Sequence, residues 1–172
     1  MMQTDVLSAH ISQSGFLVPA KTRLKQITYC GNAGQAGNVC FFDTTAAAVS
    51  AVYQRSGTTV TVTKTAHGLA TGAIVGIGFV SAGAVSATDG NYTITVTGVD
   101  TFTLVDPNTG TVAGGTTCYY VSGNGSRWMT SFNTLTGATS SQQIPIPGEG
   151  MLARNGIYVS ILYITFVTVF YG

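Results

Sequence analysis

Charge is the scarcest property of this 172-residue sequence. Charged residues make up 8% of the chain, against about a quarter in an average soluble domain. The seven Lys and Arg and the six Asp and Glu leave a formal net charge of +1. Disordered chains combine high charge with low hydrophobicity, whereas 45% of these residues are hydrophobic and the mean hydropathy is +0.33. We therefore expect a folded chain.

The shortage of charge also narrows the function. Proteins that bind phosphate backbones cluster Lys and Arg, and here only Lys21, Arg23 and Lys25 stand close together in the sequence. Six acids and two histidines give few combinations for acid–base or metal chemistry. His67 and His10 are interpreted as a turn residue and an isolated strand residue. We expect no nucleic-acid partner, no enzyme, no cofactor and no metal site.

Cysteines and long apolar runs are also few. Three cysteines cannot form a complete set of intrachain disulfides. Cys30 and Cys40 flank a glycine-rich turn and either pair across a hairpin or remain buried free thiols, the second being favoured. Residues 1–13 are polar and mixed, so no secretion signal is expected. Residues 157–170 are shorter than the ~20 residues of a membrane helix and rich in β-formers, so they predict buried β structure and no membrane partner.

Helical periodicity is missing from almost the whole chain, and residues 44–52 are the best short helix candidate. Alternating apolar and polar residues instead predict an all-β fold. Turn composition predicts a turn at residues 106–110 and a polar loop at 140–143, and the prolines of residues 144–148 exclude that segment from a central strand. The predicted strands are residues 6–11, 16–18, 22–30, 39–43, 58–64, 73–80, 92–97, 101–105, 128–132, 157–161 and 166–171.

Residues 22–43 illustrate how the pattern assigns faces. Alternation places Leu24 on the opposite face from Arg23 and Lys25, so one face of this strand is expected in the core and the other at solvent or a partner. The glycines and asparagines of residues 31–38 predict a hairpin loop that returns the chain as the strand 39–43.

The strand groups suggest two domains. Neither the first nor the last group has enough strands to close a core, but together they match a sandwich of about 100 residues. We expect a jelly-roll or immunoglobulin-like β-sandwich formed by residues 1–48 and 121–172, with a small β-barrel or sandwich of residues 49–120 inserted in a loop. The alternative is two consecutive domains.

Aromatic residues are the most plausible contact residues. Tyr and Trp are favoured both at protein interfaces and in sugar-stacking sites, whereas the phenylalanines are expected mainly in the core. Together with the three clustered cations, the candidate interface set is Lys21, Arg23, Lys25, Tyr119, Tyr120, Trp128, Tyr158, Tyr163 and Tyr171.

One compound motif resembles a known family. The sequence HGLATG at residues 67–72 lies between TVTV at 59–62 and the segments NYTITV at 91–96 and DTFTL at 100–104. This order resembles a small β-module of bacteriophage structural proteins over residues 58–106. Ala73 stands where that module usually has Asp, and the Asp-Gly-Asn order at 89–91 also departs from it. The flanking segments resemble short virion proteins of tailed phages.

The resemblance implies a structural virion protein. We expect a capsid decoration or cement protein that is assembled in the bacterial cytoplasm, binds the major capsid protein or other virion proteins, and forms homo-oligomers. A tail, neck or fibre component is the alternative within this class. From another class, an extracellular carbohydrate-binding module would use Tyr119, Tyr120 or Trp128 as a platform for a surface glycan.

Overall fold

The regular structure of the protein is entirely β, as the sequence predicts. A computed structural model describes residues 6–80, 85–123, 125–135, 137 and 139–172. Residues 44–52, the best helix candidate, form a connection and the start of a strand. The strands are β1 (Leu7–Ile11), β2 (Gly15–Val18), β3 (Thr22–Gly31), β4 (Asn38–Asp43), β5 (Val49–Thr63), β6 (Ile74–Phe79), β7 (Gly90–Thr93), β8 (Thr95–Gly98), β9 (Thr101–Ser122), β10 (Arg127–Asn133), β11 (Ser141–Pro145), β12 (Met151–Ala153), β13 (Ile157–Leu162) and β14 (Ile164–Tyr171).

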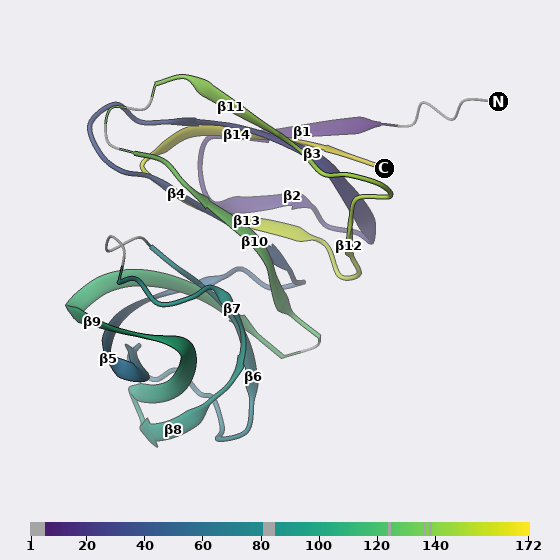
Figure 1. The fold of residues 1–172 in the computed structure, drawn as a ribbon. Helices are drawn as coiled ribbons and strands as arrows, with labels where there is room; N and C mark the ends of the chain where they lie inside the picture. The colour runs from purple at the N-terminus through teal and green to yellow at the C-terminus, as the bar shows by residue number, and fades with distance from the viewer. Residues whose placement is uncertain (1–5, 81–84, 124, 136, 138) are drawn as a thin grey trace.

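Two antiparallel sheets form a β-sandwich (Figure 1). Sheet A has the order β1-β14-β3-β11, with the short β12 also pairing β3, and sheet B has the order β10-β4-β13-β2. Apolar residues from alternate positions of both sheets fill the space between them. The buried members of this core are Leu17, Val18, Leu24, Ile27, Tyr29, Val39, Phe41, Ala153, Ile157, Val159, Ile164, Val167 and Val169.

A third sheet, sheet C, curls around a core of its own (Figure 1). Its order is β5-β9-β6-β7, with β8 pairing β9. The long strands β5 and β9 pair from Val49 opposite Tyr120 to Thr63 opposite Thr101. The large side chains of this core include Tyr53, Phe79, Phe102, Ile77 and Leu104.

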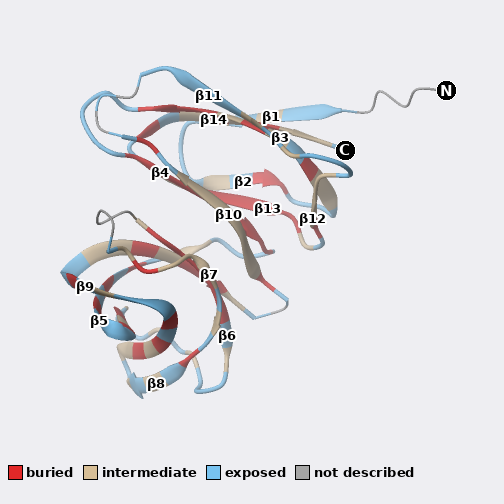
Figure 2. Cartoon of the chain, viewed as in Figure 1, coloured by how far each residue is buried: buried red, intermediate tan, exposed pale blue. Residues whose placement is uncertain are grey.

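Sheet B is covered on both faces, and β4 is buried along its whole length (Figure 2). Val39 and Phe41 point into the sandwich core. Cys40 and Phe42 point the other way, into a smaller cluster with Val121 of sheet C and Tyr158 of β13. Sheet C approaches closely because β6 carries glycines here: a Cβ at Gly76 would lie 2.5 Å from the carbonyl carbon of Arg127. The body therefore has three layers.

The predicted hairpin between residues 22–30 and 39–43 is wrong. β3 lies in sheet A and β4 lies in sheet B, so the glycine-rich loop crosses from one sheet to the other. The physical reason is that β4 is apolar on both faces and needs the middle layer, whereas β3 exposes polar residues on one face. Cys30 and Cys40 accordingly lie in different sheets and both are free thiols.

Two predicted loops also belong to strands. The predicted turn at residues 106–110 is a bulge inside β9, because Val105 pairs Thr59 and Gly110 already pairs Gly57. Residues 141–145 form β11 at the edge of sheet A, where Pro145 removes no central ladder bond. Residues 157–170, the membrane candidate, form the consecutive strands β13 in sheet B and β14 in sheet A. Within the described part of the chain, no helix is long and apolar enough to cross a membrane.

The strand order suits the proposed insertion. Sheets A and B take their strands from residues 7–43 and 127–171, and sheet C takes its strands from residues 49–122. The chain leaves the sandwich at Asp43 and returns at Arg127, and these two residues are paired across β4 and β10. We propose on this basis that residues 49–120 are an insertion in a loop of the sandwich.

Deleting residues 49–120 and closing the gap with a short Gly-Ser bridge is expected to leave a folded β protein. Val49 and Tyr120, the first and last residues of the deleted segment, are paired across β5 and β9, and the core between sheets A and B contains no residue of that segment. The variant should be less stable than the whole chain, because Cys40 and Phe42 lose the cover that β6 and Tyr119 provide. Circular dichroism and a cooperative thermal transition measure the outcome, and an unfolded variant would support consecutive domains instead.

Candidate functional site

The buried ion pair of sheet C is part of its framework. Arg55 and Asp106 lie 3.2 Å apart with almost no exposure of either side chain. The guanidinium also donates to the carbonyl oxygens of Val85 (3.1 Å) and Ser86 (2.8 Å), and Asp106 accepts from the backbone N–H of Asn108 (2.7 Å). Because these bonds are directed at backbone groups around the bulge of β9, the pair holds that bulge in shape.

Asp43 has a similar role where sheet B meets the connection to sheet C. Its carboxylate accepts hydrogen bonds from the backbone N–H groups of Arg154 (2.9 Å) and Asn155 (2.7 Å) and pairs with Nε of Arg127 at 3.2 Å. Asp43 is 1% exposed, whereas the side chain of Arg127 is 43% exposed. Asp43 therefore orders the turn after β12 and also positions an arginine at the surface.

Asp89 lies between sheets B and C. It accepts a hydrogen bond from the backbone N–H of Phe79 (2.6 Å) and another from the hydroxyl of Ser131 on β10. Burial raises the pKa of Asp89 above its ordinary value, although both hydrogen bonds favour the charged form. The charge of Asp89 in turn adds to burial in raising the pKa values of Cys40, Tyr53 and Tyr92, which face it.

Asp89→Asn is expected to remove a pH dependence of stability. Because the folded-state pKa is raised, the folded protein holds this proton more tightly than the unfolded chain, and the wild type loses stability as pH rises through that pKa. Asn keeps the size and an acceptor oxygen but does not titrate. Thermal unfolding measured from mildly acidic to neutral pH should show that the melting temperature of the variant rises relative to that of the wild type as pH increases. A constant or shrinking difference would contradict this role of Asp89.

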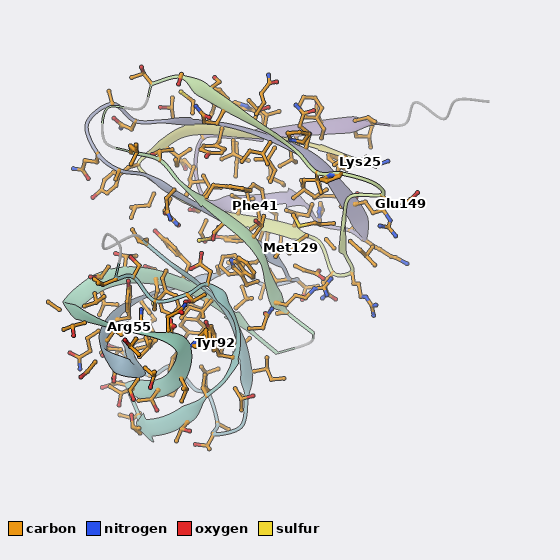
Figure 3. All side chains as sticks on the ribbon, viewed as in Figure 1. Lys25, Phe41, Arg55, Tyr92, Met129 and Glu149 are labelled. Atoms are coloured by element: carbon orange, nitrogen blue, oxygen red, sulfur yellow. The ribbon has the colours of Figure 1, made fainter. Side chains whose placement is uncertain are left out.

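Five of the seven cations gather at one end of the sandwich. We call this surface the basic end, and Figure 3 shows nitrogen-tipped side chains gathered there, around the labels of Lys25 and Glu149. Of the other two cations, Arg55 lies in β5 of sheet C and Lys64 directly follows that strand. The members of the basic end are Lys21, Arg23, Lys25, Arg127 and Arg154.

The segment around β12 connects these cations. Arg23 donates to the carbonyl of Gly150 at 3.4 Å, and the stem of Lys25 passes 3.4 Å from where a Cβ of Gly150 would lie. Arg127 donates to the carbonyl of Leu152 at 2.7 Å. Leu152 is also the cross-strand neighbour of Arg23. Arg23, Lys25 and Arg127 therefore all lie beside residues 150–152, and Arg154 follows this segment in the chain.

A groove of about 390 Å³ opens beside the basic end, between sheet C and the sandwich. Its apolar lining comes from Trp128, Met129, Met151 and Leu152, and its charged lining comes from Arg127 and Arg154. Asn91 of β7 closes one side, where its amide accepts from the backbone N–H of Trp128 at 2.9 Å. The groove therefore combines an apolar floor with two arginines.

Sequence reasoning found only part of this surface. The closeness of residues 21, 23 and 25 was visible, but Arg127 and Arg154 are far from them in the sequence. The missing signal was the pairing of β12 with β3, a strand of three residues after two glycines that has no clear pattern.

The predicted aromatic candidates fall into four environments. Tyr120 is 2% exposed in the core of sheet C, so its ring cannot contact a partner at the surface. Tyr119, Trp128 and Tyr158 pack in or against the cluster between sheets B and C, and burial raises the pKa values of Tyr119 and Tyr158. Tyr171 packs against the sandwich core. Tyr163 is 45% exposed, at a positive φ of 53° between β13 and β14.

The two histidines have local partners. Nδ1 of His67 accepts from the backbone N–H of Leu69 at 3.0 Å and Nε2 donates to the carbonyl of Gly98 at 3.1 Å, so the ring holds a turn together. His10 contacts the hydroxyl of Thr168 at 2.9 Å and lies against the ring of Phe166. Among the described residues, no group of three or more His, Cys, Asp or Glu could hold a metal ion.

The chain was compared with protein-family models and with curated proteins. No protein-family model matches the chain, and no curated protein matches it.

Proposed function

We propose that this protein is a non-enzymatic structural component of a tailed-phage virion, a capsid decoration or cement protein that docks on the shell. The observation that carries the proposal is the basic end: cations are gathered at one exposed end of a charge-poor, three-layered β body. Surface charges of one sign that face outward steer and orient a protein on its partner.

The interior carboxylates support a structural role over a catalytic one. Asp43 and Asp106 are each 1% exposed, and both accept several hydrogen bonds from backbone groups. Carboxylates bound in this way serve the fold, since a catalytic acid or base needs access to a substrate proton. The similarity of residues 58–106 to a module of phage structural proteins points to the same class.

Placement of the aromatics weighs against a carbohydrate-binding module. A stacking platform needs the face of an exposed ring, yet Tyr120 is buried and Tyr119 and Trp128 pack against the cluster between sheets B and C. In the described structure, Nε1 of Trp128 is also buried without a hydrogen-bond partner. Trp128 is therefore partly buried: it packs against this cluster and also lines the groove beside the basic end, so it does not present a free ring face.

Quantitative mass spectrometry of purified particles tests the proposal. A decoration protein is expected in hundreds of copies per particle, because it follows the repeating lattice of the shell. A copy number in the low tens would overturn the decoration role in favour of a tail, neck or fibre component. Absence from purified particles would overturn the virion assignment.

A further inference from the structure

Among the described residues, the acids do not form a surface patch that could bind the basic end of a second copy. Of the five acids in the described residues, Asp43 and Asp106 are buried, and Asp89 bonds to Phe79 and Ser131 inside the body. Asp100 accepts from the backbone N–H of Ala66 at 2.7 Å in the turn beside β9. Glu149 is exposed but belongs to the basic end itself. The described acids therefore offer a second copy no separate acidic patch for the basic end.

We propose that the basic end and its groove bind an acidic polypeptide segment of a different protein, and that contacts between copies of this chain use other surfaces. The charges carry this proposal: the basic end holds five cations against Glu149 and the buried Asp43, so it keeps an excess of positive charge that suits a partner supplying acidic groups. The identity of that partner as a virion component rests on the proposed function. That the surface suits an acidic segment follows from its charges and its apolar lining, whatever the partner is.

Arg127 is held in a fixed orientation that suits contact with a carboxylate. Its guanidinium is fixed by Nε at Asp43 and by a terminal nitrogen at the carbonyl of Leu152, and 43% of its side chain remains exposed. A planar guanidinium held in one orientation loses little freedom when it receives a carboxylate. Arg154 lines the same groove, so two adjacent acidic side chains could be bound together.

The groove favours a polypeptide over a nucleic acid. Its floor is formed by Met129, Met151 and Leu152, which suits the aliphatic parts of a peptide. Single-stranded nucleic acids are bound by several exposed aromatic rings along a basic track, whereas the lining of this groove has a single aromatic side chain, Trp128, which is itself partly buried against the cluster between sheets B and C. We therefore assign the surface to an acidic protein segment.

Binding of a fluorescently labelled peptide of about ten glutamates to the full chain, followed by anisotropy at two salt concentrations, tests the proposal. Affinity should fall as salt increases. Each neutralised cation should weaken binding about twofold to fivefold, so Arg23→Gln, Lys25→Gln and Arg154→Gln combined should weaken it about tenfold or more. These positions are chosen because Arg127 also neutralises the buried Asp43.

Lys64→Gln is the matched control for Arg154→Gln, since it removes one cation directly after β5 of sheet C and should leave affinity unchanged. Equal weakening by both variants, or no peptide binding, would overturn the site. Tighter binding of a single-stranded oligonucleotide of equal charge would overturn the choice of a polypeptide. Self-association in sedimentation velocity that Arg154→Gln abolishes would show a second copy to be the occupant. Particle copy number is measured separately, so failure here is distinguishable from failure of the virion assignment.

Discussion

Gly76→Ala will lower the free energy of unfolding by about 3 kcal/mol, the upper part of the range for forcing an extra carbon into a packed interior. The new Cβ would overlap the backbone nitrogen of Trp128 and lie 2.5 Å from the carbonyl carbon of Arg127. Both atoms belong to the backbone of β10, so no side-chain rotation relieves the overlap. Sheet C must move away from sheet B, and chemical denaturation should show a lower midpoint.

Gly114→Ala is the matched control. Gly114 lies in β9, and an added Cβ would meet only the side-chain oxygen of Gln54 at 3.4 Å. This substitution should change stability by no more than about 0.5 kcal/mol, as is usual for surface positions. Wild-type stability of Gly76→Ala would show that β6 does not pack on β10 as described.

Arg55→Met should destabilise sheet C by about 3–5 kcal/mol, because removing one partner of a buried ion pair leaves the other charge uncompensated. Asp106 would keep its donors from Thr88 and Asn108 but lose the guanidinium that balances its charge, at 0% side-chain exposure. The carbonyl oxygens of Val85 and Ser86 would lose their donor at the same time. Thermal unfolding followed by circular dichroism measures the loss.

Lys64→Met serves as the control for Arg55→Met. It introduces the same residue directly after β5, the strand that contains Arg55, but breaks no buried pair, so its effect should stay within about 0.5 kcal/mol. Combining Arg55→Met with Asp106→Asn should recover part of the lost stability, since the buried charge is then removed. Equal instability of Arg55→Met and Lys64→Met would mean that the ion pair is not important for folding.

Local pattern was sufficient to predict the all-β class. The alternation of β3 correctly separated the buried Leu24 from the outward Arg23 and Lys25. The partner of each strand was harder to predict, because pairing depends on which faces become covered. β4 illustrates this: its apolar residues on both faces were visible, but its place in a middle layer depends on sheet C and on the glycines of β6.

The candidate site was predictable only in part for the same reason. Residues 21, 23 and 25 are close in any extended strand. Arg127 is placed by the pairing of β10 with β4, 84 residues away in the chain, and Arg154 follows β12, which pairs β3 over more than 100 residues. Turn composition was also an incomplete guide. Residues 106–110 contain Asp, Pro, Asn and Gly, yet the ion pair with Arg55 lets β9 continue through them as a bulge.

The paired positions of Asp43 and Arg127 have a mechanical consequence. The chain enters and leaves sheet C through two connections that start side by side, and the hydroxyls of Thr44 and Ser126 lie 3.0 Å apart just beyond them. A lobe on a single tether can swivel, but two adjacent connections together with the glycine-lined contact to sheet B resist torsion. A partner that binds the basic end would therefore also fix the orientation of sheet C. In a repeating lattice, every copy would then present sheet C in the same orientation.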